Sequence, residues 1–101
     1  MIASALENIV YLELLRKGYE VYIGKFDQTE IDFVATKQGE KLYIQIAQRI
    51  TSKETKDMEY GRLLSISDNY PKYVLRTDEF SGGNYEGIRT MHVADFLLML
   101  Q

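Results

Sequence analysis

Apolar positions near the N-terminus predict a helix that is buried on most of its sides. Ser4 and Glu7 form an S-x-x-E capping box, in which each side chain caps a backbone N–H group at a helix start. Gly18 supplies the expected stop, because glycine readily adopts the positive φ found at helix C-termini. Six large apolar residues lie between these signals: Leu6, Ile9, Val10, Leu12, Leu14 and Leu15.

Strand-like alternation follows this helix over three segments. Residues 19–26, 30–36 and 41–48 are rich in tyrosine and β-branched residues, which favour strands. Gln38 and Gly39 lie between the second and third segments, where glycine can supply the positive φ of a tight hairpin turn. We therefore expect these two strands to form an antiparallel hairpin.

A turn centred on Gln38 and Gly39 also predicts which residues face each other. Three apolar pairs would share one face: Ile31 with Ile46, Phe33 with Ile44, and Ala35 with Leu42. The other face would carry Asp32 with Gln45, Glu30 with Ala47, and Val34 with Tyr43. Because successive strand side chains alternate sides, a polar cluster around Asp32 and Gln45 is expected to face away from the first core.

The second half of the chain predicts a crossover. Thr51 and Glu54 form a second capping box, opening a helix through about Leu64 that carries Met58, Tyr60 and Leu63 inward. Strands are expected at residues 72–77 and 88–93, a loop at 81–84 and a short helix at 94–100. A helix between strands implies a crossover connection, so we expect an α/β fold with a mixed sheet flanked by helices, in the order α-β-β-β-α-β-β-α.

Composition narrows the classes of function. A chain of 101 residues with 46% hydrophobic content fits one domain over residues 1–101. Cysteine is absent, which excludes disulfides and thiolate catalysis and favours the cytoplasm. The longest apolar run, residues 96–100, is far below the roughly 20 residues that span a bilayer, so no membrane is expected. A net charge of −3 argues against broad attraction to nucleic acid, although a local basic patch stays open.

The order of elements resembles the PD-(D/E)XK nuclease superfamily, with an acid in the first helix, an aspartate on the second strand and a polar residue opposite it. The chain more closely resembles the C-terminal domain of prokaryotic AAA+ ATPases, in the phrases "ENIVYLELLRKGYEVYIGK", "EIDFVA", "YIQIA", "DNYPKYVL" and "HVADFLL". This resemblance spans nearly the whole chain. It implies a single restriction-endonuclease-like domain at the C-terminal end of a longer ATPase. No G-x-x-x-x-G-K-[ST] phosphate loop occurs in the sequence, so ATP would bind the absent part.

Carried over residue by residue, the nuclease resemblance implies a half-intact site. In that superfamily carboxylates hold Mg²⁺ or Mn²⁺, and a lysine stabilises developing negative charge. Glu7 takes the helix position, Asp32 the strand aspartate, Gln45 the glutamate of E-x-K, and Ala47 the lysine. Gln45 keeps an oxygen donor but loses one negative charge, and Ala47 offers neither charge nor donor. We therefore assign no catalytic residue, and keep Glu7, Asp32 and Gln45 as candidate metal ligands.

Each candidate also has a structural interpretation. Glu7 fits the helix cap, Gln45 fits a solvated sheet position, and His92 fits a strand-end or helix cap. The tyrosines within predicted elements, including Tyr11, Tyr19, Tyr22, Tyr43 and Tyr73, fit core packing better than stacking on bases.

Three functional hypotheses remain open. The leading one is an auxiliary, non-cleaving domain that binds a partner protein or nucleic acid beside its own AAA+ ATPase domain. The second is a Mg²⁺- or Mn²⁺-dependent nuclease in which a displaced cation replaces the missing lysine; the candidates are Lys25, Lys41 and Arg49. The third is an association module that docks through edge strands or through Phe96, Leu97 and Leu100 of the terminal helix.

Overall fold

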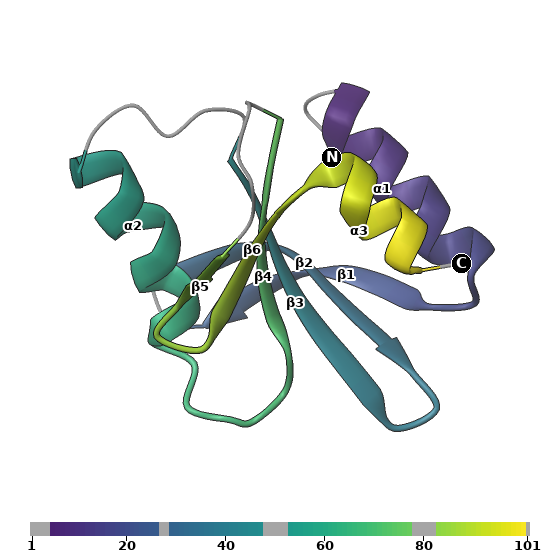
Figure 1. Cartoon of the computed structure of the whole chain (residues 1–101). Coiled ribbons are helices and arrows are strands. Elements are labelled where there is room, and N and C mark those ends of the chain that lie inside the picture. The colour runs from purple at the N-terminus through teal and green to yellow at the C-terminus, as the bar shows by residue number, and fades with distance from the viewer. Residues whose placement is uncertain (1–4, 27–28, 48–52, 78–82, 101) are drawn as a thin grey trace.

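The computed structural model describes residues 5–26, 29–47, 53–77 and 83–100, which form a mixed β-sheet with helices on both faces (Figure 1). The helices are α1 (Ala5–Arg16), α2 (Lys53–Leu64) and α3 (Val93–Met99). The strands are β1 (Glu20–Phe26), β2 (Thr29–Lys37), β3 (Glu40–Ala47), β4 (Lys72–Arg76), β5 (Gly83–Tyr85) and β6 (Ile88–His92).

The six strands lie in the order β1-β2-β3-β4-β6-β5. β1, β2 and β3 form an antiparallel meander, whereas β3, β4 and β6 run parallel. Parallel neighbours cannot be joined by a tight turn, and α2 lies on the connection from β3 to β4. The α/β class, the mixed sheet and the order of the three helices and of the five predicted strands agree with the prediction.

The strand β5 is a correction to the predicted order. Residues 83 and 84 were expected to lie in a loop, but they pair with β6 in an antiparallel hairpin whose turn contains Glu86 and Gly87. Both turn residues have positive φ, 49° and 91°. A three-residue strand is too short to show an alternating pattern, so only its turn chemistry signals it.

The β2–β3 hairpin has the predicted turn. Gln38 and Gly39 adopt φ values of 49° and 84°, as in the two-residue turn that matches the twist of a hairpin. The register pairs Phe33 with Ile44, Val34 with Tyr43 and Ala35 with Leu42, as expected. Within the part of the chain that the structure describes, this register ends at Phe33 and Ile44.

A β-bulge beyond Phe33 breaks the predicted alternation of side chains along β2. Tyr22 of β1 pairs with Val34, but Gly24 pairs with Ile31, so β2 contains one extra residue at this point. An extra residue reverses the alternation of side chains along a strand. Ile31 therefore packs with Val34, whereas Ile46 packs against the opposite face. The predicted facing of Ile31 with Ile46 is wrong. Glu30 pairs with Lys25 of β1, and the described β2–β3 register does not extend to the predicted pair Glu30 and Ala47.

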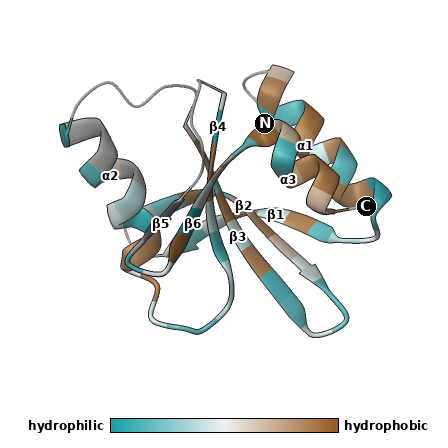
Figure 2. Cartoon of the chain, viewed as in Figure 1, coloured by the Kyte–Doolittle hydropathy of each residue, from teal (hydrophilic) through white to brown (hydrophobic). Residues whose placement is uncertain are grey.

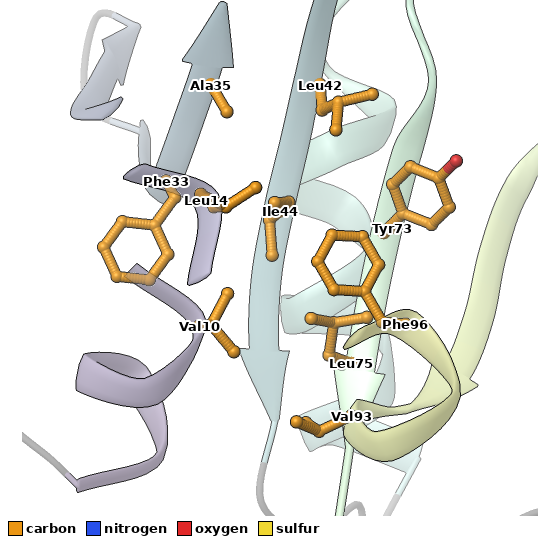
Figure 3. Packing of buried hydrophobic residues seen from close by; sticks show 10 residues of the cluster. All are labelled: Val10, Leu14, Phe33, Ala35, Leu42, Ile44, Tyr73, Leu75, Val93 and Phe96. Atoms are coloured by element: carbon orange, nitrogen blue, oxygen red, sulfur yellow. The ribbon is translucent and has the colours of Figure 1, made fainter. Parts of the chain in front are cut away.

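The larger core lies between the sheet and the pair α1 and α3. Figure 3 shows side chains from both helices pointing toward the side chains of β2, β3 and β4. Its buried members are Val10, Leu14, Phe33, Ala35, Leu42, Ile44, Tyr73, Leu75, Val93 and Phe96. Phe96 is fully buried and meets the ring of Tyr73 edge to face, with centroids 5.4 Å apart. The predicted role of Phe96 in docking is therefore wrong, because its ring is already used in the core.

A smaller core lies on the α2 side of the sheet. Tyr60 and Leu63 of α2 pack inward as predicted, and the hydroxyl groups of Tyr60 and Thr90 are hydrogen-bonded. Met58, also expected to point inward, is 53% exposed. The capping residues Ser4 and Thr51 lie outside the described residues. Among those that are described, no helix is both long and apolar enough to cross a bilayer.

The first helix is less buried than its composition predicts. Val10 and Leu14 are fully buried, but Ile9, Leu12 and Leu15 are 51%, 54% and 41% exposed. The helix ends at Arg16, just before the predicted stop Gly18, whose φ is 93° and whose N–H donates to the Leu15 carbonyl. Within the described chain, α1 is an outer layer with only one face on the core.

Removing the Phe96 ring should test the larger core. Phe96→Ala leaves a cavity between α3 and β4 and should lower the free energy of unfolding by about 3–5 kcal/mol. Phe96→Leu keeps most of the volume and should cost clearly less. Urea unfolding followed by circular dichroism measures both, and equal losses would contradict the packing described here.

Candidate functional site

Two hydrogen bonds link Asp32 of β2 to Gln45 and Ile46 of β3 at the point where β2 and β3 stop pairing. The backbone N–H of Ile46 donates to Asp32 Oδ2 at 2.8 Å, and the backbone N–H of Asp32 donates to Gln45 Oε1 at 3.0 Å. Each side chain thus serves a backbone donor of the other strand, next to the last backbone-paired residues. We refer to this pair of hydrogen bonds as the Asp32–Gln45 bridge.

Gln45 is buried, contrary to its interpretation as a solvated sheet residue. Its exposed fraction is 1%, and it lies on the same face of β3 as Tyr43 and Ala47, which both belong to the α2-side core. A buried amide is costly unless it is hydrogen-bonded. The bond from the Asp32 N–H to Gln45 Oε1 meets that need, so the amide has a structural role whatever else it does.

Asp32 and Gln45 supply few of the ligands that Mg²⁺ prefers. Mg²⁺ prefers several oxygen ligands in octahedral geometry, usually including carboxylates. The bridge offers one carboxylate and one neutral amide. One oxygen atom of each side chain already accepts a backbone hydrogen bond. Glu7 lies half-buried on α1, and among the described residues no three His, Cys, Asp or Glu side chains are grouped to hold a metal. The structure therefore brings Asp32 and Gln45 together without completing a ligand set.

Arg76 is the functional candidate that the sequence did not reveal. Ala47 is buried, and its register partner on the parallel strand β4 is Arg76. Register partners on neighbouring strands project from the same face of a sheet, so the guanidinium group belongs to the same face as the Ala47 methyl. A helix crossover sets this register, and no turn in the sequence signals it.

The basic residues expected as replacements lie elsewhere. Lys25 is exposed on β1, which is separated from β3 by β2. Lys41 lies near the start of β3, with its ammonium 5.8 Å from the ring centre of Tyr43 and 5.3 Å from that of Tyr70. Arg49 lies outside the described residues.

His92 has the capping role that was predicted for it. Its Nδ1 accepts a hydrogen bond from the Ala94 N–H at 3.0 Å, at the start of α3. Nδ1 is thereby unprotonated, so Nε2 carries the hydrogen and donates to the Thr77 carbonyl at 3.2 Å. His92 is also the register partner of Arg76. The imidazole ties the end of β4 to α3 and is fully engaged in doing so.

A second polar cluster fixes the turn between α2 and β4. The Tyr43 hydroxyl donates to Asp68 Oδ2 at 2.5 Å, and the Lys72 ammonium donates to Asp68 Oδ1 at 3.0 Å and to the Tyr70 carbonyl at 3.0 Å. Burial by itself would raise the pKa of Asp68, but these side-chain hydrogen bonds, that from the Tyr70 N–H and the charge of Lys72 lower it below its ordinary value of 3.8. Burial, and then the bond to Asp68, raises the pKa of Tyr43.

Most of the tyrosines pack as expected. Tyr43 and Tyr73 are buried, and Tyr11 stacks on Phe33 with ring centres 6.0 Å apart. Tyr22 departs from that expectation, since 48% of it is exposed on the edge strand β1.

Comparison with known proteins identifies a relative. A protein from Haemophilus influenzae, described as uncharacterized, is 44% identical over 96 residues, which are 95% of this chain. The matched region is 23% of that protein, so the chain spans about a quarter of its relative's length. No family model matches the chain. The homologous region thus occurs as one part of a longer protein in that organism.

Substitution of Asp32 should show that the bridge stabilises the fold. Asp32→Ala removes the acceptor of the Ile46 N–H and should lower the free energy of unfolding by about 1–3 kcal/mol. Asp32→Asn retains an acceptor oxygen and should cost less than half as much. Chemical denaturation of both variants measures the difference, and equal losses would show that the hydrogen bond does not matter.

Asp68 should make folding stability depend on pH. Its folded-state pKa is lowered, so its contribution is fully present above 3.8 and is lost as the pH falls through the folded-state value. Asp68→Asn should therefore be less stable than the parent chain at pH 6, with a gap that narrows on acidification below about 4. Thermal unfolding from pH 6 to pH 2 tests this, and a gap that stays constant would contradict it.

Proposed function

We propose that this chain is a non-cleaving accessory domain of a longer protein whose remaining part is an AAA+ ATPase. Its fold would be a degenerate form of the restriction-endonuclease-like fold. The observation that carries the proposal is the Asp32–Gln45 bridge beside Ala47. Where the nuclease resemblance implies metal ligands and a lysine, this chain has two side chains that hold strands together and a buried methyl group.

The arrangement of elements supports the restriction-endonuclease-like part of this proposal. A helix, an antiparallel three-stranded meander, a crossover helix and a parallel strand occur in that order, and Asp32 of the second strand meets Gln45 of the third. The same arrangement can serve unrelated activities, so the site rather than the fold decides between cleaving and not cleaving.

The length of the Haemophilus influenzae relative supports the accessory-domain part. The matched region is 23% of that protein, which leaves ample chain for a motor domain. In this proposal the ATPase part binds ATP in the cytoplasm, and residues 1–101 need no metal or cofactor. Their role is to contact protein, since the net charge of −3 disfavours phosphate backbones.

A metal-dependent nuclease is the second candidate function, and the position of Arg76 favours it. A guanidinium on the same face as Gln45 and Ala47 is placed to approach a phosphate that the lysine would otherwise contact. It cannot supply the missing carboxylate, so this candidate also needs a cation held by fewer charges than is usual.

Cleavage assays separate the two functions. With supercoiled plasmid and increasing Mn²⁺, the parent chain should produce no cutting above the level of Asp32→Asn, which keeps a hydrogen-bond acceptor at the bridge. Arg76→Ala is assayed in parallel, because it removes the guanidinium that the nuclease candidate would use to contact phosphate. Mn²⁺-dependent cutting that both substitutions abolish would establish the nuclease and overturn the accessory role.

A further inference from the structure

Helix α1 carries a second apolar stripe on the side opposite its core stripe. Leu6, Val10 and Leu14 face the sheet, with the latter two fully buried. Ala5, Ile9 and Leu12, also spaced by four and three residues, lie on the outward side and are exposed. An outer helix of a complete domain normally presents charged or polar residues there, so α1 has the composition of a helix between two layers.

Helix α3 shows the same feature. Val93 and Phe96 are buried, and Leu97 and Leu100 pack against the core. Leu98 and Met99 point the other way and are 65% and 43% exposed. Asp95 lies between them on the helical wheel and is exposed.

The two outward stripes belong to one side of the molecule. α1 and α3 pack against each other on the same face of the sheet, away from α2 (Figure 1). Figure 2 shows apolar residues recurring along both helices. We call the set Ile9, Leu12, Leu15, Leu98 and Met99 the outer α1/α3 face; it holds half of the large apolar side chains found exposed among the described residues. Exposed apolar side chains that gather on one side of a soluble protein often mark a contact site.

We propose that the outer α1/α3 face docks against the rest of the longer polypeptide, burying α1 and α3 between two layers. This inference rests on the proposed accessory-domain function. The homologous region in Haemophilus influenzae is part of a chain about four times as long, which supplies a covalently linked partner at high effective concentration.

The polar residues around this face indicate the chemistry of the partner surface. Asp95 is exposed between the apolar side chains of α3, whereas Asn8 of α1 is exposed but uncharged. The guanidinium of Arg16 is already paired with the Glu13 carboxylate at 2.7 Å. A helix with an apolar stripe and a Lys or Arg opposite Asp95 would complement this face, since charges at an interface favour the correct partner and orientation.

Hydrogen–deuterium exchange tests the docking directly. Amide exchange is measured in residues 1–101 alone, which contain their own two cores, and in the natural full-length chain. The amides of α1 and α3 should exchange at least tenfold more slowly in the full-length chain, whereas those of α2 should not change. Equal exchange of α1 and α3 in the two proteins would overturn the docking inference and leave the accessory-domain proposal standing.

Paired substitutions identify the surface responsible. Leu12→Gln with Leu98→Gln in the full-length chain should restore fast exchange in α1 and α3 without unfolding residues 1–101. Met58→Gln, which removes an exposed apolar side chain from α2 instead, should leave the protection intact. If both sets of variants behave alike, protection does not come from this face and the inference fails.

Two further outcomes distinguish the alternatives. A natural chain that ends with residues 1–101 would defeat the accessory-domain proposal itself. Light scattering that shows a dimer of residues 1–101, dissociated by Leu12→Gln with Leu98→Gln but not by Met58→Gln, would make a second copy the occupant and overturn docking on the rest of the chain.

Discussion

The hydrogen bonds between Asp32 and the segment Gln45–Ile46 hold β2 and β3 together beyond the point where their backbone pairing ends. β2 and β3 pair through their backbones from the hairpin as far as Phe33 and Ile44, and the bulge in β2 follows immediately. A bulge leaves backbone groups unpaired, and unpaired buried groups cost free energy. The Asp32–Gln45 bridge pairs two such N–H groups with side-chain oxygens. Beyond Phe33 and Ile44, hydrogen bonds to side-chain oxygens therefore take the place of backbone pairing between β2 and β3.

This constraint explains why two polar residues persist inside a mostly apolar sheet. Gln45 is 1% exposed between Tyr43 and Ala47, a position that would suit an apolar residue better if the backbone ladder continued. Under the proposed function, the same two side chains occupy the positions that a metal site would use. Stabilising the sheet and binding a metal are then separable roles. Gln45 and Ala47 lack the charges that metal-dependent cleavage would need, but Gln45 still accepts the hydrogen bond that stabilises the sheet.

Predictions from sequence succeeded where a local signal sets the geometry. Gly39 fixes the hairpin turn and Gly18 ends α1, each by a positive φ that the residue type reveals. Predictions failed where a residue's neighbours come from segments that are distant in the sequence. The bulge beyond Phe33 moved Ile31 to the other face, and the β3–β4 register brought Arg76 beside Ala47 through a crossover that no turn specifies. Extending the hairpin register predicted that Asp32 and Gln45 lie opposite each other. It did not predict that their side chains would accept hydrogen bonds from backbone N–H groups of the neighbouring strand.

The error over α1 is the most informative one. Its apolar residues occupy most of the helix circumference, which predicts burial on most sides, yet in the described chain only one side meets a core. α3 shows the same excess, with Leu98 and Met99 outward while Phe96 fills the core. Apolar stripes exposed on the same side of two adjacent helices favour aggregation, so a cover for both is the simplest reason for their presence. Under the docking inference, the apolar pattern of both helices suits a longer protein in which a further layer covers them.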